Sequence, residues 1–189
     1  MGRNMAVIIS MLRGVNVGGH NKVKMEALRA LYESLGLRDA QNYVQSGNVI
    51  FRTGERDLIR LARRIEKAIE QSFGFHSDVI VRTSAELREV MAKNPFATRR
   101  GIEPGKLLII FLASDPSREA RDKVRTIKAD PEELSIDGRE LYIYFPTGIG
   151  KSKLPEPAIL KTLETSGTGR NWTSVTKMLE IAEKLETSQ

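Results

Sequence analysis

A glycine-rich segment with two cations, Leu12-Arg-Gly-Val-Asn-Val-Gly-Gly-His-Asn-Lys22, joins a predicted strand to a predicted helix. Glycine accepts positive φ and lets the backbone approach a ligand closely. The N–H groups at a helix start and the charges of Arg13 and Lys22 attract anions. The segment matches neither Gly-x-Gly-x-x-Gly nor Gly-x-x-x-x-Gly-Lys-Ser/Thr. Two interpretations stay open: a loop that binds an anion, and a loop whose glycines only turn the chain.

A second polar segment, Gln45-Ser-Gly-Asn48, forms a tight turn before another predicted strand. In a ferredoxin-like sheet the end of the first strand lies beside the start of the third, so this turn and the glycine-rich loop should meet at one edge. Ser46 lacks a base unless His20 reaches it, and neither segment holds an acid to orient that histidine, which disfavours a Ser-His-Asp enzyme. Asn48 has the alternative of a left-handed turn conformation beside Gly47. The candidate ligand-binding residues are Arg13, Gly14, Asn16, Gly18, Gly19, His20, Gln45, Ser46 and Asn48.

The segment Phe145-Pro-Thr-Gly-Ile-Gly-Lys-Ser152 ends like a phosphate-binding P-loop. Phe145 occupies the position of the first glycine and Pro155 hampers the helix that should follow, so we reject nucleotide hydrolysis. Backbone amides and ammonium groups could still hold an oxyanion here. Further along, Arg170 stands where the last helix begins and could hold a carboxylate or phosphate. The alternative is that this segment only caps the helix and packs Trp172 against the core. The candidate secondary anion site comprises Gly148, Gly150, Lys151, Ser152, Lys153, Arg170, Asn171 and Trp172.

Composition excludes several other chemistries. Cysteine is absent, which removes disulfides, thiol nucleophiles and thiolate zinc sites. The two histidines, His20 and His76, cannot form a metal cluster alone, so we expect no metal and no required cofactor. The longest apolar run, 107–113, is far below the roughly 20 residues that span a bilayer. No signal peptide is visible, so we expect a cytoplasmic protein.

The charge is uneven along the chain. Residues 1–95 carry 15 basic and 10 acidic side chains, whereas residues 96–189 carry 15 and 14. A basic half attracts phosphates or nucleic acid, but a helix over 57–73 with a solvated basic face explains the same pattern. Aromatic residues make up 6% of the chain, so stacking platforms for single strands are scarce. Nucleic-acid binding therefore stays open without being favoured.

Hydrophobic periodicity predicts the elements that must position these residues. In the first half the order is strand, helix, strand, strand, helix, strand, which is the ferredoxin-like βαββαβ arrangement. The predicted elements are strand 6–12, helix 25–35, strand 42–44, strand 49–52, helix 57–73 and strand 76–82.

The second half nearly repeats this order at a period of about 100 residues. It contains strand 106–113, helix 116–127, strands 134–136 and 140–145 joined by an Asp-Gly turn, a helical stretch 158–164, and a long helix 172–185 in place of the last strand. We therefore expect an α+β protein with two related ferredoxin-like subdomains and antiparallel sheets, the second ending in a helix instead of a strand. The predicted boundaries are 1–83 for the N-terminal subdomain, 84–105 for a connecting helix and linker, and 106–189 for the C-terminal α+β subdomain.

Five segments carry a family likeness: Leu12-Arg-Gly-Val-Asn-Val-Gly-Gly19, Gln45-Ser-Gly-Asn-Val49, Asn94-Pro-Phe96, Tyr142-x-x-x-Pro-x-Gly-x-Gly-Lys-Ser-Lys-Leu154 and Arg170-Asn-Trp-x-x-Val-Thr-Lys177. Together they resemble the bacterial domain-of-unknown-function family 1697, over essentially the whole chain. The chain departs from the family pattern at 167–170, where the family more often has Thr or Ala before the arginine. The resemblance implies an α+β protein with two related subdomains and implies no activity.

Three hypotheses about function remain. The leading one is a binding or enzymatic domain for a small phosphorylated or nucleotide-like ligand, in which Arg13 and Lys151 neutralise charge while Asn16, Gln45 and Asn48 orient the ligand. The second is nucleic-acid binding by the basic N-terminal half. The third is a structural or partner-binding protein whose loops only shape turns. No competent acid–base pair is evident, so the sequence does not establish an enzyme.

Overall fold

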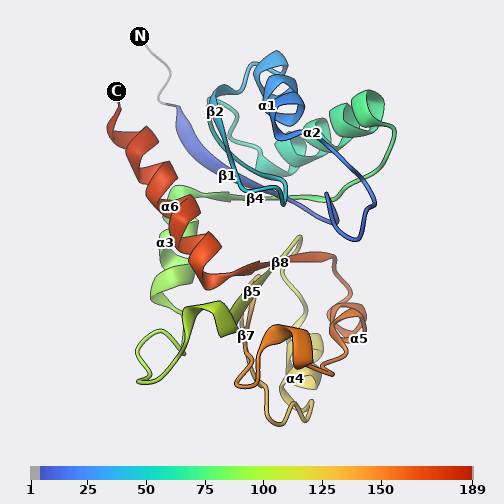
Figure 1. Ribbon diagram of the computed structural model, residues 1–189, viewed down its shortest axis with the longest axis vertical. Coiled ribbons are helices and arrows are strands. Elements are labelled where there is room, and N and C mark those ends of the chain that lie inside the picture. Colours follow the sequence, from blue (N-terminus) through green and yellow to red (C-terminus); the bar gives the residue numbers. More distant parts are fainter. Residues whose placement is uncertain (1–4, 189) are drawn as a thin grey trace. The chain divides into compact units, whose positions relative to one another are not determined.

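The computed structural model describes residues 5–188 and divides the chain into two compact units (Figure 1). One unit comprises Met1–Arg88 together with Lys177–Gln189, and the other comprises Glu89–Thr176. Each unit contains one four-stranded antiparallel sheet. No helix among the described residues is both long and apolar enough to cross a membrane.

The first unit has the predicted βαββαβ order followed by a helix. Its strands lie in the order β2-β3-β1-β4, and helices α1 and α2 cover the same face of the sheet (Figure 1). Met11 pairs with Asn48 across β1 and β3, so the end of β1 lies at the start of β3. The elements are β1 (Ala6–Leu12), α1 (Met25–Ser34), β2 (Arg38–Tyr43), β3 (Asn48–Thr53), α2 (Leu58–Phe73), β4 (Val79–Thr83) and α3 (Ser84–Ala92).

Helix α2 begins and ends on local signals. The Asp57 carboxylate accepts the backbone N–H of Arg60 at 2.9 Å, which satisfies one of the donors left open at a helix start. Gly74 ends the helix with φ of 77°, a left-handed conformation that glycine adopts with little strain. Between these caps, Leu61, Ile65 and Ile69 recur at helical spacing and are buried. These signals explain why the helix predicted over 57–73 matches the structure closely.

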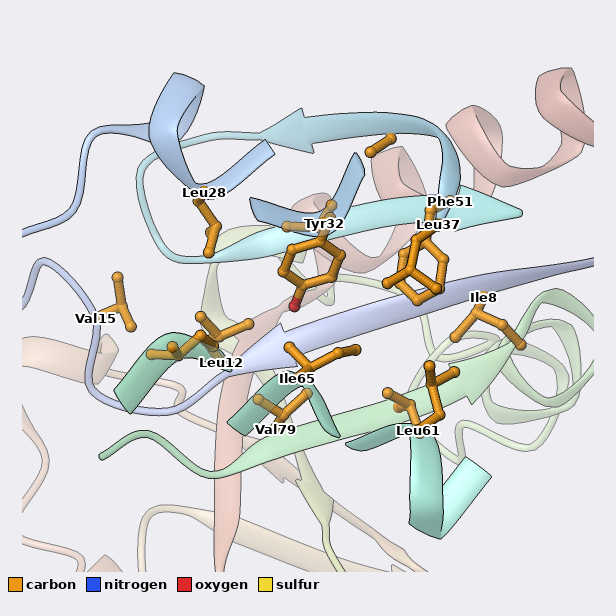
Figure 2. Close-up of a cluster of buried hydrophobic side chains, with 14 of the residues drawn as sticks. Ile8, Leu12, Val15, Leu28, Tyr32, Leu37, Phe51, Leu61, Ile65 and Val79 are labelled. Carbon is orange, nitrogen blue, oxygen red and sulfur yellow. The ribbon is translucent and has the colours of Figure 1, made fainter. Parts of the chain in front are cut away.

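The core of the first unit lies between the two helices and the sheet (Figure 2). Ile8 and Phe51 point from paired strands toward α1 and α2, and Tyr32 of α1 packs edge-on against Phe51 with ring centroids 5.4 Å apart. The Tyr32 hydroxyl points toward β1 and lies 2.7 Å from the hydroxyl of Ser10. Both side chains are fully buried, and this burial raises the pKa of Tyr32. Each hydroxyl thus has the other as a hydrogen-bonding partner within an otherwise apolar core.

We expect the Ser10–Tyr32 pair to show strong energetic coupling. Tyr32→Phe leaves the buried Ser10 hydroxyl without this partner, and so should lower the free energy of unfolding by about 1 to 3 kcal/mol. Ser10→Ala should cost a similar amount. The double variant should cost less than the sum, because neither hydroxyl remains to be satisfied. Urea unfolding of the four proteins measures this, and strictly additive losses would contradict the coupling.

The second unit repeats the topology of the first. Its strands lie in the order β6-β7-β5-β8, the same arrangement as β2-β3-β1-β4. Single-turn 3-10 helices at Pro104–Lys106 and Ile149–Lys151 precede β5 and α5. Its elements are β5 (Leu107–Leu112), α4 (Arg118–Arg125), β6 (Glu133–Asp137), β7 (Glu140–Tyr144), α5 (Glu156–Thr162) and β8 (Gly167–Asn171). The last helix, α6 (Trp172–Thr187), begins in this unit and continues into the first.

Backbone contacts at equivalent places support a structural duplication with the predicted period. At the end of β1, Leu12 donates to the carbonyl of Gly47 in the β2–β3 turn, and at the end of β5, Leu112 donates to Arg139 in the β6–β7 turn. The following residues also correspond, since Arg13 donates to Asp78 just before β4 and Ala113 donates to Ser166 just before β8. The two first strands are thus offset by 100 positions, from Leu12 to Leu112.

The structure differs from the sequence prediction at the C-terminal end. The chain does end in a helix, α6, but a strand that the sequence did not predict, β8, precedes it and pairs with β5. The division into units also differs from the predicted boundaries, because Lys177–Gln189 belongs with the first unit. Arg88 of α3 forms ion pairs there with Glu183 and Glu186 of α6. A helix of 16 residues is roughly 24 Å long, so its two ends can belong to different units.

Candidate functional site

The loop after β1 and the turn between β2 and β3 meet, as the strand order predicted. The backbone N–H of Leu12 donates to the carbonyl of Gly47 at 3.1 Å. The side-chain amide of Asn16 donates to the carbonyl of Gln45 at 2.8 Å. Two segments about 30 positions apart in the sequence therefore form one edge of the first unit.

Asn16 holds the glycine-rich loop in a defined conformation. Its amide nitrogen also donates to the carbonyl of Val23 at 3.0 Å, and its oxygen accepts the N–H of Val23 at 2.9 Å. Asn21 supports the same loop by donating from its side chain to the carbonyl of Gly14 at 3.1 Å. Both asparagines adopt positive φ, 55° at Asn16 and 48° at Asn21, which asparagine accepts more readily than most residues. The loop is thus fastened through its own polar side chains.

The β2–β3 turn is held in a similar way. Gly47 has φ of 75°, and a Cβ there would lie 2.8 Å from the Cβ of Leu12. Asn48 is fully buried, and its amide donates to the carbonyl of Tyr43 at 3.1 Å and the hydroxyl of Ser46 at 2.9 Å. Val44 and Gly47, rather than Asn48, take the positive φ values of this turn. The side chains of Asn48 and Ser46 are therefore engaged in shaping the turn.

A cavity of about 710 Å³ opens beside this edge. This volume falls in the range of sites for small molecules, roughly 300 to 1,000 Å³. Three of its lining residues, Asn16, Gly19 and Gln45, are among those that the sequence proposed for ligand binding. The other lining residues are Lys22, Val23, Lys24, Met25 and Glu26, from the end of the loop and the first turn of α1.

The cavity has a polar and positively charged rim. Lys22 and Lys24 are exposed, and no side chain caps the start of α1, which follows Lys24. The N–H groups of a first helical turn carry partial positive charge and favour an anion. Glu26 is an exposed acid in the same turn and can accept hydrogen bonds. The arrangement combines two ammonium groups, backbone donors and one carboxylate around apolar Val23 and Met25.

Arg13 does not line this cavity. Its guanidinium lies 3.2 Å from the carboxylate of Asp78, whose other oxygen lies 3.1 Å from the ring of His76. Spacing in the sequence did not associate Asp78 and His76 with Arg13, although the predicted strand order implies that they meet. β4 is the other neighbour of β1, so the residues just before β4 must lie at the end of β1. The charge of Arg13 is thus offset by Asp78, which lies 65 positions away in the sequence.

The remaining candidates of the first site lie on the loop surface. Gly14, Gly18 and His20 are exposed, and the backbone of His20 donates to Val17 at 3.0 Å in a short turn. The side chain of Val17 is 63% exposed at the tip of this loop. These residues are accessible, whereas Asn48 is not.

The candidates of the secondary anion site lie at one end of the second sheet. β7 and β8 both flank the start of β5 there, because Leu107 pairs with Tyr144 and Leu108 pairs with Asn171. Gly148 has φ of 98° and accepts the N–H of Lys151 at 3.1 Å. Ser152 donates its N–H to Ile149 at 3.2 Å and accepts the N–H of Leu154 with its hydroxyl at 3.0 Å. Several amides of this segment therefore already have partners. Gly150, Lys151 and Lys153 are exposed.

Arg170 is largely buried within β8. Its guanidinium donates to the hydroxyl of Thr168 at 2.8 Å and to the carbonyl of Gly169 at 2.9 Å. Burial lowers the pKa of Arg170 to about 10. Asn171, rather than Thr168, caps α6 by accepting the N–H of Ser174 at 2.8 Å, and Trp172 is half-buried at the start of that helix. The Asn171 cap matches the helix-cap alternative that the sequence left open.

Comparisons with known proteins bear on family and fold. Residues 5–142 match the model of the family described as "Protein of unknown function (DUF1697)". No curated protein matches the chain. A solved structure described as conserved bacterial protein SP0830 from Streptococcus pneumoniae is similar, with a TM-score of 0.74 and 20% identity. The match covers 94% of this chain and 99% of that one. At this identity the likeness shows a shared fold.

Proposed function

We propose that this chain, which belongs to the DUF1697 family of proteins of unknown function, binds a small phosphorylated ligand in the cavity beside the loop after β1. One observation carries the proposal: a cavity of about 710 Å³ has two exposed lysines and the uncapped start of α1 on its wall. Phosphate is a ligand that both a helix start and nearby ammonium groups favour.

The cavity is larger than a phosphate group requires, so the rest of the ligand should also make contacts. Val23 and Met25 offer apolar surface, while Gln45 and Glu26 offer hydrogen-bonding groups. A sugar phosphate or a nucleoside monophosphate has this combination of anion, hydroxyl groups and a partly apolar body. In this proposal Asn16 acts by positioning the loop, because its amide is already bonded to Val23 and Gln45. Asn48 likewise positions the turn through Tyr43 and Ser46.

The test is a ligand titration with a charge-removing variant. Purified protein is titrated with inorganic phosphate, ribose 5-phosphate and AMP while the thermal unfolding midpoint is followed, since a ligand of the folded state raises it. We expect Lys22→Gln/Lys24→Gln to weaken binding by roughly 10- to 100-fold, because a hydrogen bond to a charged group contributes about 1.5 kcal/mol or more. A matched control, Lys123→Gln/Lys128→Gln, removes the same charge from exposed positions of the second unit and should leave affinity unchanged.

A third variant decides between the two candidate sites. Lys151→Gln/Lys153→Gln removes two exposed charges from the loop after β7. Binding that survives Lys22→Gln/Lys24→Gln but is lost in Lys151→Gln/Lys153→Gln would move the site to the second unit. No midpoint shift with any of the three probes would count against a small phosphorylated ligand altogether.

A further inference from the structure

Helix α2 displays a row of cations on its exposed side. Arg60, Arg63, Arg64 and Lys67 are all exposed and follow one another at the i, i+3, i+4, i+7 spacing that places residues on one helical face. We call these four residues the α2 basic stripe. At 1.5 Å per residue the stripe extends over about 10 Å of the helix. The opposite face of α2 carries Leu61, Ile65 and Ile69 into the core.

The stripe is not neutralised by neighbouring acids. Within residues 5–188 no ion pair joins an acid to Arg60, Arg63 or Lys67, while the Arg64 guanidinium donates to the carbonyl of Leu35 at 3.2 Å. The acids of α2 form no ion pair with the stripe. Glu66 accepts the N–H of Val79 at 3.0 Å, and Glu70, three residues after Lys67, is exposed and makes no ion pair with it. Four like charges on one helix face cost self-repulsion, which a polyanion would relieve.

Helix α4 of the second unit also carries several arginines, but these have acidic partners. On α4, Arg118 and Arg125 both pair with Asp122, at 3.8 and 2.7 Å, and Arg121 pairs with Asp115 at 2.6 Å. These three arginines are therefore compensated locally. The contrast identifies the α2 basic stripe as a localised positive surface rather than a consequence of net charge.

The surroundings of the stripe favour a nucleic-acid backbone over other polyanions. An amphipathic helix binds a membrane by inserting its apolar face, but the apolar face of α2 lies in the core of the unit. A stable protein interface needs a buried apolar centre with aromatic anchors, whereas the only large apolar side chain of α2 exposed to solvent is Ile59. Three of the four cations are arginines, whose planar groups hold phosphates with two parallel hydrogen bonds. Because one strand of a duplex rises 3.4 Å per phosphate, a 10 Å stripe spans about three steps, which join about four successive phosphates.

We propose that the α2 basic stripe binds the phosphate backbone of nucleic acid without sequence preference. The stripe is separate from the cavity beside α1. The proposal therefore does not depend on whether a small ligand binds in that cavity. The stripe offers positively charged contacts to phosphates, which carry no sequence information, so affinity should depend on salt and little on sequence.

The experiment measures fluorescence anisotropy of a labelled DNA duplex of about 20 base pairs and of one of its strands. For four phosphate contacts, raising NaCl from about 50 to about 200 mM should weaken wild-type binding roughly 50- to 150-fold. Arg60→Gln/Arg63→Gln/Lys67→Gln should bind more weakly and lose only roughly threefold over the same range, since one contact remains. This triple variant spares Arg64 and its bond to Leu35. Arg118→Gln/Arg121→Gln/Arg125→Gln removes the same charge from α4 and should keep the wild-type salt dependence.

Folding and partner class are controlled within the same series. Thermal melting checks each variant, and Arg60→Lys/Arg63→Lys keeps the charges, so it should retain the salt dependence even if the glutamine variant is less stable. The proposal is overturned if neither DNA binds at low salt, or if the α2 and α4 triple variants lose affinity equally. Tighter binding to polyglutamate or to phosphatidylserine vesicles than to DNA would also overturn it, because the partner would then be a protein or a membrane.

Discussion

Gly47→Ala is expected to lower the free energy of unfolding by about 3 kcal/mol. Two costs combine at this position. An alanine at φ of 75° is strained by about 1 to 2 kcal/mol. Its Cβ would also lie 2.8 Å from the Cβ of Leu12, a fixed part of a buried strand, and such overpacking costs about 1 to 3 kcal/mol. Because Gly47 also accepts the N–H of Leu12, the strain falls directly on the contact between the loop and the turn.

Gly74→Ala provides the matched control for the Gly47 prediction. Gly74 has nearly the same φ, 77°, but a Cβ there would meet nothing within 4 Å. This variant should therefore show the conformational cost alone, about 1 to 2 kcal/mol. Urea unfolding of both variants separates the steric contribution from the backbone contribution. Equal losses for the two would mean that the close approach of Leu12 is relieved without cost. For Gly47→Ala we also expect weaker ligand binding, because Gln45 of this turn lines the cavity together with Asn16, which bonds to it.

Asn16→Ala should lower the free energy of unfolding by about 3 kcal/mol as well. The substitution removes three hydrogen bonds, to the carbonyls of Val23 and Gln45 and from the N–H of Val23. Each such bond contributes about 0.5 to 1.5 kcal/mol, and the buried backbone of Val23 would lose its partner. Alanine at φ of 55° adds conformational strain. The loop should then become mobile and the cavity should lose its defined wall.

Asn21→Ala is the comparison that isolates the role of Asn16. Asn21 belongs to the same loop and also has positive φ, 48°, but its side chain makes one hydrogen bond, to Gly14. Its loss should cost about 1 kcal/mol for the bond plus the same strain. Asn16→Gly removes the strain and keeps the loss of the bonds. Chemical unfolding and titration with AMP on the three variants test the assignment, which is wrong if Asn16→Ala and Asn21→Ala are equally damaging.

Elements with local signals were predictable from the sequence. The apolar spacing and the Asp57 cap of α2 depend on residues within a few positions, and the structure places the helix at Leu58–Phe73. The Asp137–Gly138 turn was likewise predicted, and Gly138 adopts φ of 54° between β6 and β7. The meeting of the first loop with the β2–β3 turn followed from strand order, which these elements imply. The local sequence was enough to predict these elements, because each signal depends on residues that lie within a few positions of one another.

Strand β8 shows where local signals fail. Its sequence, Gly167-Thr-Gly-Arg-Asn171, lacks the apolar alternation by which a strand is predicted. Both glycines are explained by their neighbours across the sheet and in the core. A Cβ at Gly167 would lie 2.9 Å from the side chain of Ile110, and one at Gly169 would lie 3.3 Å from that of Leu108. The apolar surface on this side of β8 is supplied by β5, so the strand exists through its pairing rather than through its own residues.

The sequence by itself determined the fold class, the duplicated order of elements and the edge of the first sheet where polar loops gather. The tertiary structure alone decided which polar groups remain accessible there. Asn48 is buried in its turn, Arg13 faces Asp78, and the cavity belongs instead to Lys22, Lys24 and the start of α1. The physical reason is the range of the interactions involved. Helix periods and caps depend on near neighbours in the chain, whereas Arg13 meets Asp78 across 65 positions and Asn48 lies where β3 pairs with the distant β1.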